Sequence, residues 1–441
     1  MNTTDTIAAP ASAVGGAVSV IRISGANALA VGNAVWQGKS PLDDSCVRVM
    51  KLGRIGLEPA LAVYMKSPHS YTGDDVVEIQ CHGGAAAADH ALKKIFAAGA
   101  RCAEPGEFTF RAFVNGKLDL TQAEAVADLI NSSGDAAFQL AARQLSGALG
   151  NKLNNIYDKL NYLRSECEAR LDFPDEQLDF ADEIPGFDEA SAAITHLLDT
   201  RLISEKMHNG IEIVLAGKPN AGKSSLLNLL LGYNRAIVSN IPGTTRDTVE
   251  AECVLNDIPV HLVDTAGLRE TSDPIEKLGV ERSKSSISRS QITLFLLDAS
   301  ADDPAGEINA MADIEAPVVI GVWNKIDLAG DKALPELPCP TVKISAHTGE
   351  NLENLIDLIS EKVFGSRDFT VPEVVLNSRC GDLLEKSLAA LQAAKERFIL
   401  GEYELAADDL ALSARHLGSA IGKTVEPDAL DEVFKNFCIG K

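Results

Sequence analysis

The chain has 441 residues, of which 46% are apolar and 23% are charged, enough for two or three globular domains that each bury a core. Its net charge of −23 argues against nonspecific nucleic-acid binding, although residues 1–118 carry 11 basic and 10 acidic side chains and are nearly neutral. No stretch approaches 18 consecutive apolar residues and no signal-peptide pattern begins the chain, so we expect a cytoplasmic location and no membrane association.

Residues 1–118 are predicted to form an α/β domain. Runs typical of short strands cover residues 17–23, 61–65 and 76–80, and a helical pattern covers residues 85–98. Glycine and proline residues separate these runs, as turns and loops require.

From residue 119 to residue 208 the pattern becomes helical. Apolar side chains spaced by threes and fours predict one buried helix face, formed by Leu145, Leu149, Leu153, Ile156, Leu160, Leu163, Cys167 and Leu171. A second helical region follows Pro372 and runs to Lys423. Because each region is too short for a large core of its own, we expect the two to pack together and the residues between them to form an inserted domain.

Residues 217–224, with the sequence GKPNAGKS, predict a phosphate-binding loop. An apolar run at residues 211–216 precedes the loop and a helical pattern at residues 225–231 follows it, which is the context that a P-loop requires. Its glycines let backbone N–H groups approach phosphate oxygens, Lys223 reaches the β and γ phosphates, and the Ser224 hydroxyl can bind Mg²⁺. The loop by itself does not select a base.

Three further motifs, each after a strand-like run, narrow the nucleotide to GTP. Residues 264–267 resemble the DxxG motif of Ras-like GTPases, which places a carboxylate beside the metal. Residues 324–327 resemble their NKxD motif, whose aspartate accepts two hydrogen bonds from guanine, and residues 345–347 resemble the short loop whose backbone contacts the guanine O6. Together they predict a Ras-like G domain with a parallel-type α/β sheet.

Leu268 stands where Ras-like enzymes use a glutamine to orient the attacking water. Because leucine can neither donate nor accept a hydrogen bond, another residue must position the water. The polar candidates nearby are Arg269, Glu270, Asp273 and Glu276. Transition-state charge also needs a stabilising group, which an arginine or a bound monovalent cation could supply.

Segments beyond these motifs carry a family resemblance. They are residues 22–25, 78–84, 105–108, 115–120, 171–176, 243–247, 264–276 and the terminal pentapeptide FCIGK at residues 437–441, which is the most specific of them. With the P-loop, they resemble the MnmE (TrmE) family of tRNA modification GTPases over the whole chain. The resemblance implies a homodimer with an N-terminal α/β tetrahydrofolate-binding and dimerisation domain at 1–118, a helical domain made of 119–210 and 371–441, and an inserted Ras-like G domain at 211–370.

The resemblance also implies an activity. Such proteins hydrolyse GTP, with potassium bound and their G domains paired. They work in a heterotetramer-type complex with MnmG (GidA), an FAD enzyme that uses NADH. The complex adds an aminomethyl or carboxymethylaminomethyl group to C5 of the wobble uridine, position 34, of certain tRNAs. The carbon comes from a tetrahydrofolate derivative, for which the 5,10-methylene and 5-formyl forms are the candidate ligands.

Residue roles follow from the same resemblance. Glu276 would orient the attacking water, and Ser224 and Thr245 would ligate Mg²⁺. The implied K⁺ ligands are Asn220, Ser239, Ile241 and Thr244. The implied GTP contacts are Asn220, Ala221, Gly222, Lys223, Ser224, Ser225, Ser239, Asn240, Ile241, Pro242, Gly243, Thr244, Thr245, Asp264, Thr265, Ala266, Gly267, Asn324, Lys325, Asp327, Ser345, Ala346 and His347. The implied tetrahydrofolate contacts are Arg22, Glu78, Lys117 and Lys441.

Two other classes of function remain as alternatives. A ribosome-assembly or signalling GTPase would account for the nucleotide motifs but would leave residues 1–118 and the C-terminal pentapeptide without a role. A folate-dependent one-carbon transferase would account for residues 1–118 but not for a complete GTP site.

Overall fold

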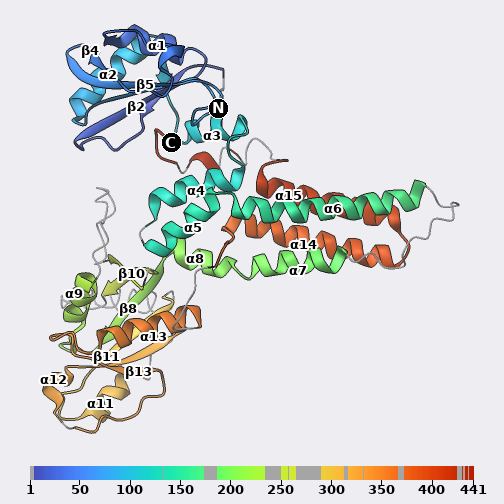
Figure 1. The fold of residues 1–441 in the computed structure, drawn as a ribbon. Coiled ribbons are helices and arrows are strands. Elements are labelled where there is room, and N and C mark those ends of the chain that lie inside the picture. Colours follow the sequence, from blue (N-terminus) through green and yellow to red (C-terminus); the bar gives the residue numbers. More distant parts are fainter. Residues whose placement is uncertain are drawn as a thin grey trace, which may run out of the picture. The chain divides into compact units, whose positions relative to one another are not determined.

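A computed structural model of the chain describes residues 4–132, 134–172, 186–233, 250–256, 258–264, 290–311, 316–330, 332–365, 372–424, 430, 433–435 and 437–441 (Figure 1). Its contacts divide into two compact units. The first unit contains Met1–Ile130, Ala142–Leu198 and Arg379–Lys441, and the second contains Asn131–Ala141 and Asp199–Ser378.

The first unit begins with a seven-stranded sheet in the order β3-β4-β5-β6-β2-β1-β7. Its elements are β1 (Ile7–Pro10), β2 (Val18–Ser24), α1 (Ala28–Val35), β3 (Trp36–Gly38), β4 (Lys51–Ile55), β5 (Glu58–Met65), β6 (Val76–His82), α2 (Ala85–Ala97), β7 (Arg101–Cys102) and α3 (Glu107–Val114). Neighbouring strands are antiparallel except β1 and β7, which are parallel. The strands and the helix predicted in residues 1–118 are confirmed, and β5 begins three residues before its predicted start.

The two faces of this sheet differ because successive side chains along a strand point to opposite sides. Helices α1 and α2 cover one face, where Ile21, Ile23 and Ile79 are buried. Arg22 and Glu78 alternate with these residues and are paired across β2 and β6. They therefore lie on the face that α1 and α2 leave uncovered.

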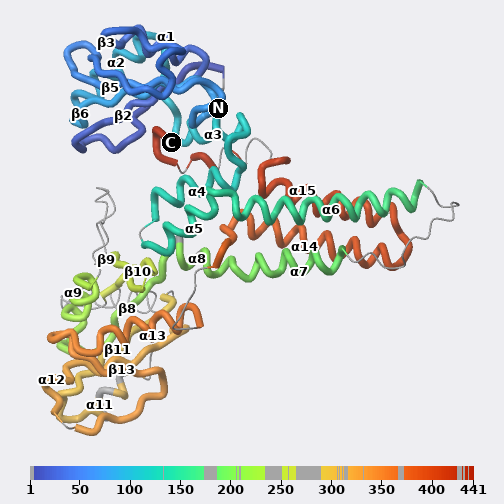
Figure 2. Tube along the Cα trace, viewed as in Figure 1, coloured from blue at the N-terminus to red at the C-terminus, as the bar shows by residue number. Residues whose placement is uncertain are grey.

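Helices that precede residues 199–378 in the sequence pack against helices that follow them (Figure 2). The helices that follow the first sheet and end the chain are α4 (Leu120–Asn131), α5 (Asp135–Leu145), α6 (Ala148–Asp172), α7 (Gly186–Leu198), α14 (Ser378–Ile399) and α15 (Tyr403–Ile421). Helix α6 packs against α7 and α15, and its predicted apolar face is buried from Leu149 to Cys167. The prediction is wrong at both ends of that face, because Leu145 belongs to α5 and Leu171 is exposed at the end of α6.

One arginine ties three of these helices together. Arg379, near the start of α14, donates from Nε and Nη2 to the carboxylate of Glu124 on α4, at 2.5 and 2.8 Å. Its Nη1 and Nη2 also donate to the carbonyl oxygens of Ser419 and Ala420 on α15, at 3.2 and 3.0 Å. Charge-assisted hydrogen bonds of this kind are among the stronger polar contacts in proteins.

The second unit contains a six-stranded sheet in the order β13-β12-β11-β8-β10-β9. Its elements are α8 (Arg201–Asn209), β8 (Ile211–Gly217), α9 (Lys223–Tyr233), β9 (Glu250–Leu255), β10 (Ile258–Asp264), β11 (Ile292–Asp298), α11 (Pro304–Ile308), β12 (Val319–Asn324), α12 (Ile326–Ala329), β13 (Thr341–Lys343) and α13 (Leu352–Phe364). Among the strands described for this sheet, β9 pairs with β10 in the antiparallel direction and the other pairs are parallel. The predicted parallel-type α/β sheet is confirmed.

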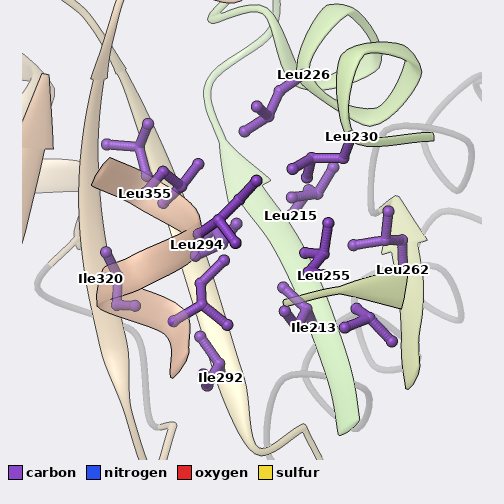
Figure 3. Close-up of a cluster of buried hydrophobic side chains, with 14 of the residues drawn as sticks. Ile213, Leu215, Leu226, Leu230, Leu255, Leu262, Ile292, Leu294, Ile320 and Leu355 are labelled. Carbon is purple, nitrogen blue, oxygen red and sulfur yellow. The ribbon is translucent and has the colours of Figure 1, made fainter. Parts of the chain in front are cut away.

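Apolar clusters lie on both faces of this sheet, as a parallel sheet requires. On one face Leu226 and Leu230 of α9 and Leu355 of α13 approach strand residues such as Leu215 and Leu294 (Figure 3). The buried side chains on the other face are Ala216, Phe295, Leu297, Ala299, Met311, Trp323 and Ala329. Within the described parts of the chain, no helix combines the length and the hydrophobicity that a membrane span needs.

Candidate functional site

The phosphate-binding loop lies between β8, which ends at Gly217, and α9, which begins at Lys223. Lys223 is buried, and its Nζ donates to the carbonyl oxygens of Gly217 and Lys218 at 2.9 and 2.8 Å. The Oγ of Ser224 lies 3.4 Å from Oδ2 of Asp264 at the end of β10. A hydroxyl and a carboxylate are oxygen ligands of the kind that Mg²⁺ prefers, so this pair fits the metal of a nucleotide site.

Asn324 joins the phosphate loop to the guanine loops. Its Nδ2 donates to the carbonyl oxygen of Ala221 at 2.8 Å, and its Oδ1 accepts from the backbone N–H of Ala346 at 2.9 Å. A Cβ atom on Gly222 would lie 2.1 Å from Asn324 Nδ2, so only glycine admits this approach. Three loops that the sequence identified separately are thus held together by one buried amide.

The side chain expected to select guanine lies at the surface and is oriented by a neighbour. Asp327 is exposed, and its Oδ1 accepts a hydrogen bond from Ser345 Oγ at 2.7 Å. Ser345 and Ala346 are buried, whereas His347 is exposed. Fixing one carboxylate oxygen in this way limits rotation of the group, and because each carboxylate oxygen has two lone pairs, both Oδ1 and Oδ2 can still accept from a ligand.

Asp298 contacts the predicted site residue Lys325, and the sequence motifs did not single it out. Its Oδ2 accepts from Lys325 Nζ at 2.5 Å, while Lys325 has a left-handed backbone with φ of 64°. Burial alone would raise the pKa of Asp298, but hydrogen bonds from Lys325 and Ser300 outweigh it and hold the pKa below its ordinary value. The one available signal was that Asp298 ends a strand next to β12, which carries the NKxD motif.

A large part of the predicted nucleotide site falls outside the described residues. These positions are Ser239, Asn240, Ile241, Pro242, Gly243, Thr244, Thr245, Thr265, Ala266, Gly267, Leu268, Arg269, Glu270, Asp273 and Glu276. Asn220 and Ser225 are described and exposed, and Asn220 has a left-handed φ of 66° within the phosphate loop.

A second charged site lies on the uncovered face of the first sheet. Arg22 Nε donates to Glu78 Oε1 at 2.8 Å, and both side chains are mostly buried. The guanidinium carbon of Arg22 lies 4.8 Å from the centre of the Tyr71 ring and 5.6 Å from that of Phe108. Two residues predicted to bind one ligand are therefore in direct contact, and two aromatic rings that the motifs did not single out as ligands lie near Arg22.

Lys117 and Lys441 lie on segments next to this pair. Lys117 Nζ donates to the carbonyl oxygen of Pro68 at 3.0 Å, in the loop that also carries Tyr71. The carbonyl oxygen of Lys441 accepts from the backbone N–H of Phe108 at 3.2 Å. The C-terminal pentapeptide is thus seated on α3, whose Phe108 faces Arg22.

Buried charges hold the start of α3. Arg111 and Glu107 are fully buried, and Arg101 donates to both carboxylate oxygens of Glu107 at 2.5 and 2.8 Å. Arg111 Nη2 and Arg101 Nε each donate to Asp5 at 2.6 Å. The network joins β7 and α3 to the segment before β1, which fixes the surface on which the pentapeptide lies.

Comparisons with known proteins cover nearly the whole chain. The MnmE helical domain matches residues 120–438, and the GTP-binding protein TrmE N-terminus matches residues 6–117. The tRNA modification GTPase MnmE of Thiobacillus denitrificans is 39% identical over 444 residues, covering 99% of this chain and 98% of the relative. That of Clostridioides difficile is 39% identical over 459 residues, covering 99% of each.

Among solved structures, the G domain of the T. maritima FeoB iron transporter is 27% identical, with a TM-score of 0.27 over 35% of this chain and 97% of that chain. The two family matches and the full-length relatives lead to one conclusion. The chain belongs to the tRNA modification GTPase MnmE family.

Proposed function

We propose that this chain hydrolyses GTP in a potassium-dependent reaction that supports modification of the wobble uridine of tRNA. The enzyme class, a GTP hydrolase of tRNA modification, is that of its family. The observation that carries the proposal is the meeting of the phosphate loop and the guanine loops at Asn324, through its bonds to Ala221 and Ala346. A nucleotide site needs these loops together, whereas an accidental match of motifs does not.

The residues of the nucleotide loops have separate parts in the proposed binding of GTP. Lys223 and the amides at the start of α9 bind the phosphates, because both present positive charge or N–H groups to them. Asp327 accepts from guanine and excludes adenine, whose edge does not match. Ser224 and Thr245 would hold Mg²⁺, and the carboxylate of Asp264, which lies 3.4 Å from Ser224 Oγ, would supply negative charge nearby. When bound, Mg²⁺ neutralises phosphate charge.

Because Leu268 cannot form hydrogen bonds, other groups must orient the attacking water and stabilise the transition-state charge. We assign the water to Glu276, whose carboxylate can accept its proton, and the charge to K⁺ held by Asn220, Ser239, Ile241 and Thr244. The exposed, left-handed position of Asn220 in the phosphate loop supports its part in this assignment. When bound, K⁺ supplies positive charge beside the phosphates, as an arginine finger does.

We assign a folate-binding site to the residues on and beside the first sheet. Glu78 can accept from the donor edge of a pterin, and the basic groups of Arg22, Lys117 and Lys441 suit carbonyl oxygens and a glutamate tail. The contact between Arg22 and Glu78, with Lys117 and Lys441 on adjoining segments, fits a 5,10-methylene- or 5-formyltetrahydrofolate.

The remaining assignments extend the same proposal. Residues 1–118 bind folate and dimerise, residues 119–210 and 371–441 form the helical domain, and residues 211–370 form the G domain. The homodimer acts in the cytoplasm with MnmG (GidA), in a heterotetramer-type complex. The product is an aminomethyl or carboxymethylaminomethyl group on C5 of uridine 34 of certain tRNAs.

GTP turnover in KCl and in NaCl at equal ionic strength tests the potassium assignment. We expect turnover in K⁺ to be faster on the order of a hundredfold, because one well-placed charge-stabilising group is worth about that much. The Asn220→Ala variant should lose most of this difference while its affinity for GDP changes little. Equal turnover of the native chain in the two salts would overturn the proposal.

A further inference from the structure

Arg22 is held in place but keeps two donor groups available. Its side chain is 14% exposed, and its Nε is used by Glu78 at 2.8 Å. The structure gives Nη1 and Nη2 no hydrogen-bond partner among the described residues. Arginine presents its terminal N–H groups as a planar fork that matches a carboxylate or a pair of carbonyl oxygens. The direction of this fork therefore decides what Arg22 can bind.

Two aromatic rings restrict that direction. The Tyr71 and Phe108 ring centres lie 4.8 and 5.6 Å from the guanidinium carbon, within the range of about 6 Å for cation–π attraction. Phe108 is fully buried among Ile7, Ala9 and Ala103, and Tyr71 packs against the same cluster. Glu78 fixes one edge of the guanidinium, and the rings restrict its remaining freedom.

Tyr71 is itself anchored by α3. Its hydroxyl group lies 2.8 Å from Oγ1 of Thr109, and Thr109 is fully buried. Burial raises the pKa of Tyr71 above its ordinary value, and the hydrogen bond with Thr109 and the charge of Arg22 offset only part of this increase. Because the ordinary value is already near 10, the phenol is neutral at physiological pH. The ring is thus a fixed surface rather than a mobile loop side chain.

We propose that Tyr71 is a positioning residue for the folate site: it holds the Arg22 guanidinium so that Nη1 and Nη2 face a carboxylate or carbonyl oxygen of the bound tetrahydrofolate. The inference rests on the proposed folate function and adds a residue to it. Tyr71 acts through Arg22 rather than by touching the ligand. The Phe108 ring also contacts the guanidinium, but Phe108 is part of the buried core, and a substitution there would disturb packing as well. Substitutions of Tyr71 therefore give the cleaner test.

Calorimetric titration of the full-length protein with 5-formyltetrahydrofolate measures the effect. Tyr71→Leu removes the ring face, and we expect it to weaken binding about tenfold, which lies between the effects of exposed and of fully desolvated cation–π contacts. Tyr71→Phe keeps the ring and loses only the bond to Thr109, so its dissociation constant should stay within about threefold of the native value. Tyr162→Leu, which changes an exposed tyrosine on α6, is the matched control and should bind as the native chain does.

A double-mutant cycle separates positioning from direct contact. In an Arg22→Gln background the fork is absent, so Tyr71→Leu should change the dissociation constant by less than about twofold. A tenfold loss in that background would overturn the inference, because Tyr71 would then contact the ligand itself. Equal weakening by Tyr71→Phe and Tyr71→Leu would also overturn it, since the hydroxyl and not the ring would then matter.

Folate binding by the native protein separates a failure of the proposed folate site from a failure of the role assigned to Tyr71. If the native protein binds no 5-formyltetrahydrofolate, the folate assignment fails and the inference fails with it. If the native protein binds and Tyr71→Leu binds equally well, the folate assignment stands and only the role of Tyr71 is refuted.

Discussion

Asp298 shows how a residue outside every motif can shape the guanine site. The ion pair with Lys325 restrains a lysine whose left-handed backbone is uncommon for a residue other than glycine, asparagine or aspartate. The lysine belongs to the motif that is proposed to contact the base, so loss of its charged partner should loosen the loop.

Asp298→Asn should therefore weaken GTP binding by about fivefold to tenfold, in line with the loss of one charge-assisted hydrogen bond. Titration with a fluorescent GTP analogue gives the dissociation constant. The control is Asp303→Asn, which alters an exposed cap that accepts from the backbone of Gly306 on α11. If both variants bind GTP as the native chain does, Asp298 has no part in the site.

The charges beneath α3 make an acid-sensitive contribution to stability. Burial by itself would raise the pKa of Glu107, but hydrogen bonds from Arg101 and from the Glu104 amide outweigh it, and the pKa lies below its ordinary value. A carboxylate of this kind stabilises the fold above the ordinary pKa of about 4.3 and loses that stabilisation as pH falls through the lowered value.

Glu107→Gln should lower the unfolding temperature at pH 7, and the gap from the parent protein should narrow as pH falls below about 4. A Trp323→Phe background leaves Trp36, in the first sheet, as the single tryptophan whose fluorescence reports unfolding. Glu104→Gln, which changes an exposed carboxylate, is the control. A gap that stays constant with pH would contradict the role assigned to Glu107.

The C-terminal pentapeptide is neither a helix nor a long strand, and backbone contacts together with the buried Phe437 side chain hold it in place. Ile439 bridges Pro105, and the carbonyl oxygen of Cys438 accepts from Gly106 N–H at 3.4 Å. Gly440 has a φ of 100°, and a Cβ atom there would lie 1.8 Å from the carbonyl oxygen of Pro10. The pentapeptide can therefore adopt this position beside Pro10 only with glycine at residue 440.

Gly440→Ala should displace Lys441 and weaken 5-formyltetrahydrofolate binding about tenfold or more, because a backbone clash must be relieved by moving the segment. Binding of GDP should not change. Gly99→Ala is a matched control, since Gly99 has a similar φ of 112° but no atom within 4 Å of an added Cβ. Equal folate binding by the two variants would show that the seat of the pentapeptide is not needed.

Elements with a strong period or a motif were predictable from the sequence. The strand, loop and helix around Lys223 and the apolar face of α6 follow directly from residue spacing. The ends of that face were wrong because a turn at residues 146–147 separates Leu145 from α6, and a repeat of apolar residues does not report where the buried part of a helix stops. Tyr71 and Asp298 were missed because their partners, Arg22 and Lys325, are 49 and 27 residues away in sequence.

In the whole molecule, the proposed nucleotide site and the proposed folate site lie in separate units of one chain. The second unit carries the nucleotide loops that meet at Asn324, and the first carries Arg22, Glu78 and the terminal pentapeptide. A GTPase of signalling or ribosome assembly would need only the second. The contacts of Arg22 with Glu78 and Tyr71 give the first unit a charged site that a GTPase of that kind would not require.

Mass spectrometry of wobble nucleosides tests whether this chain takes part in the proposed modification of tRNA. A strain that lacks this chain should lose the aminomethyl and carboxymethylaminomethyl modifications of uridine 34, and the native chain should restore them. Lys223→Ala, which removes the phosphate-binding ammonium, should fail to restore them, whereas the control Tyr162→Leu should succeed. Normal levels of these nucleosides in the deletion strain would contradict the account.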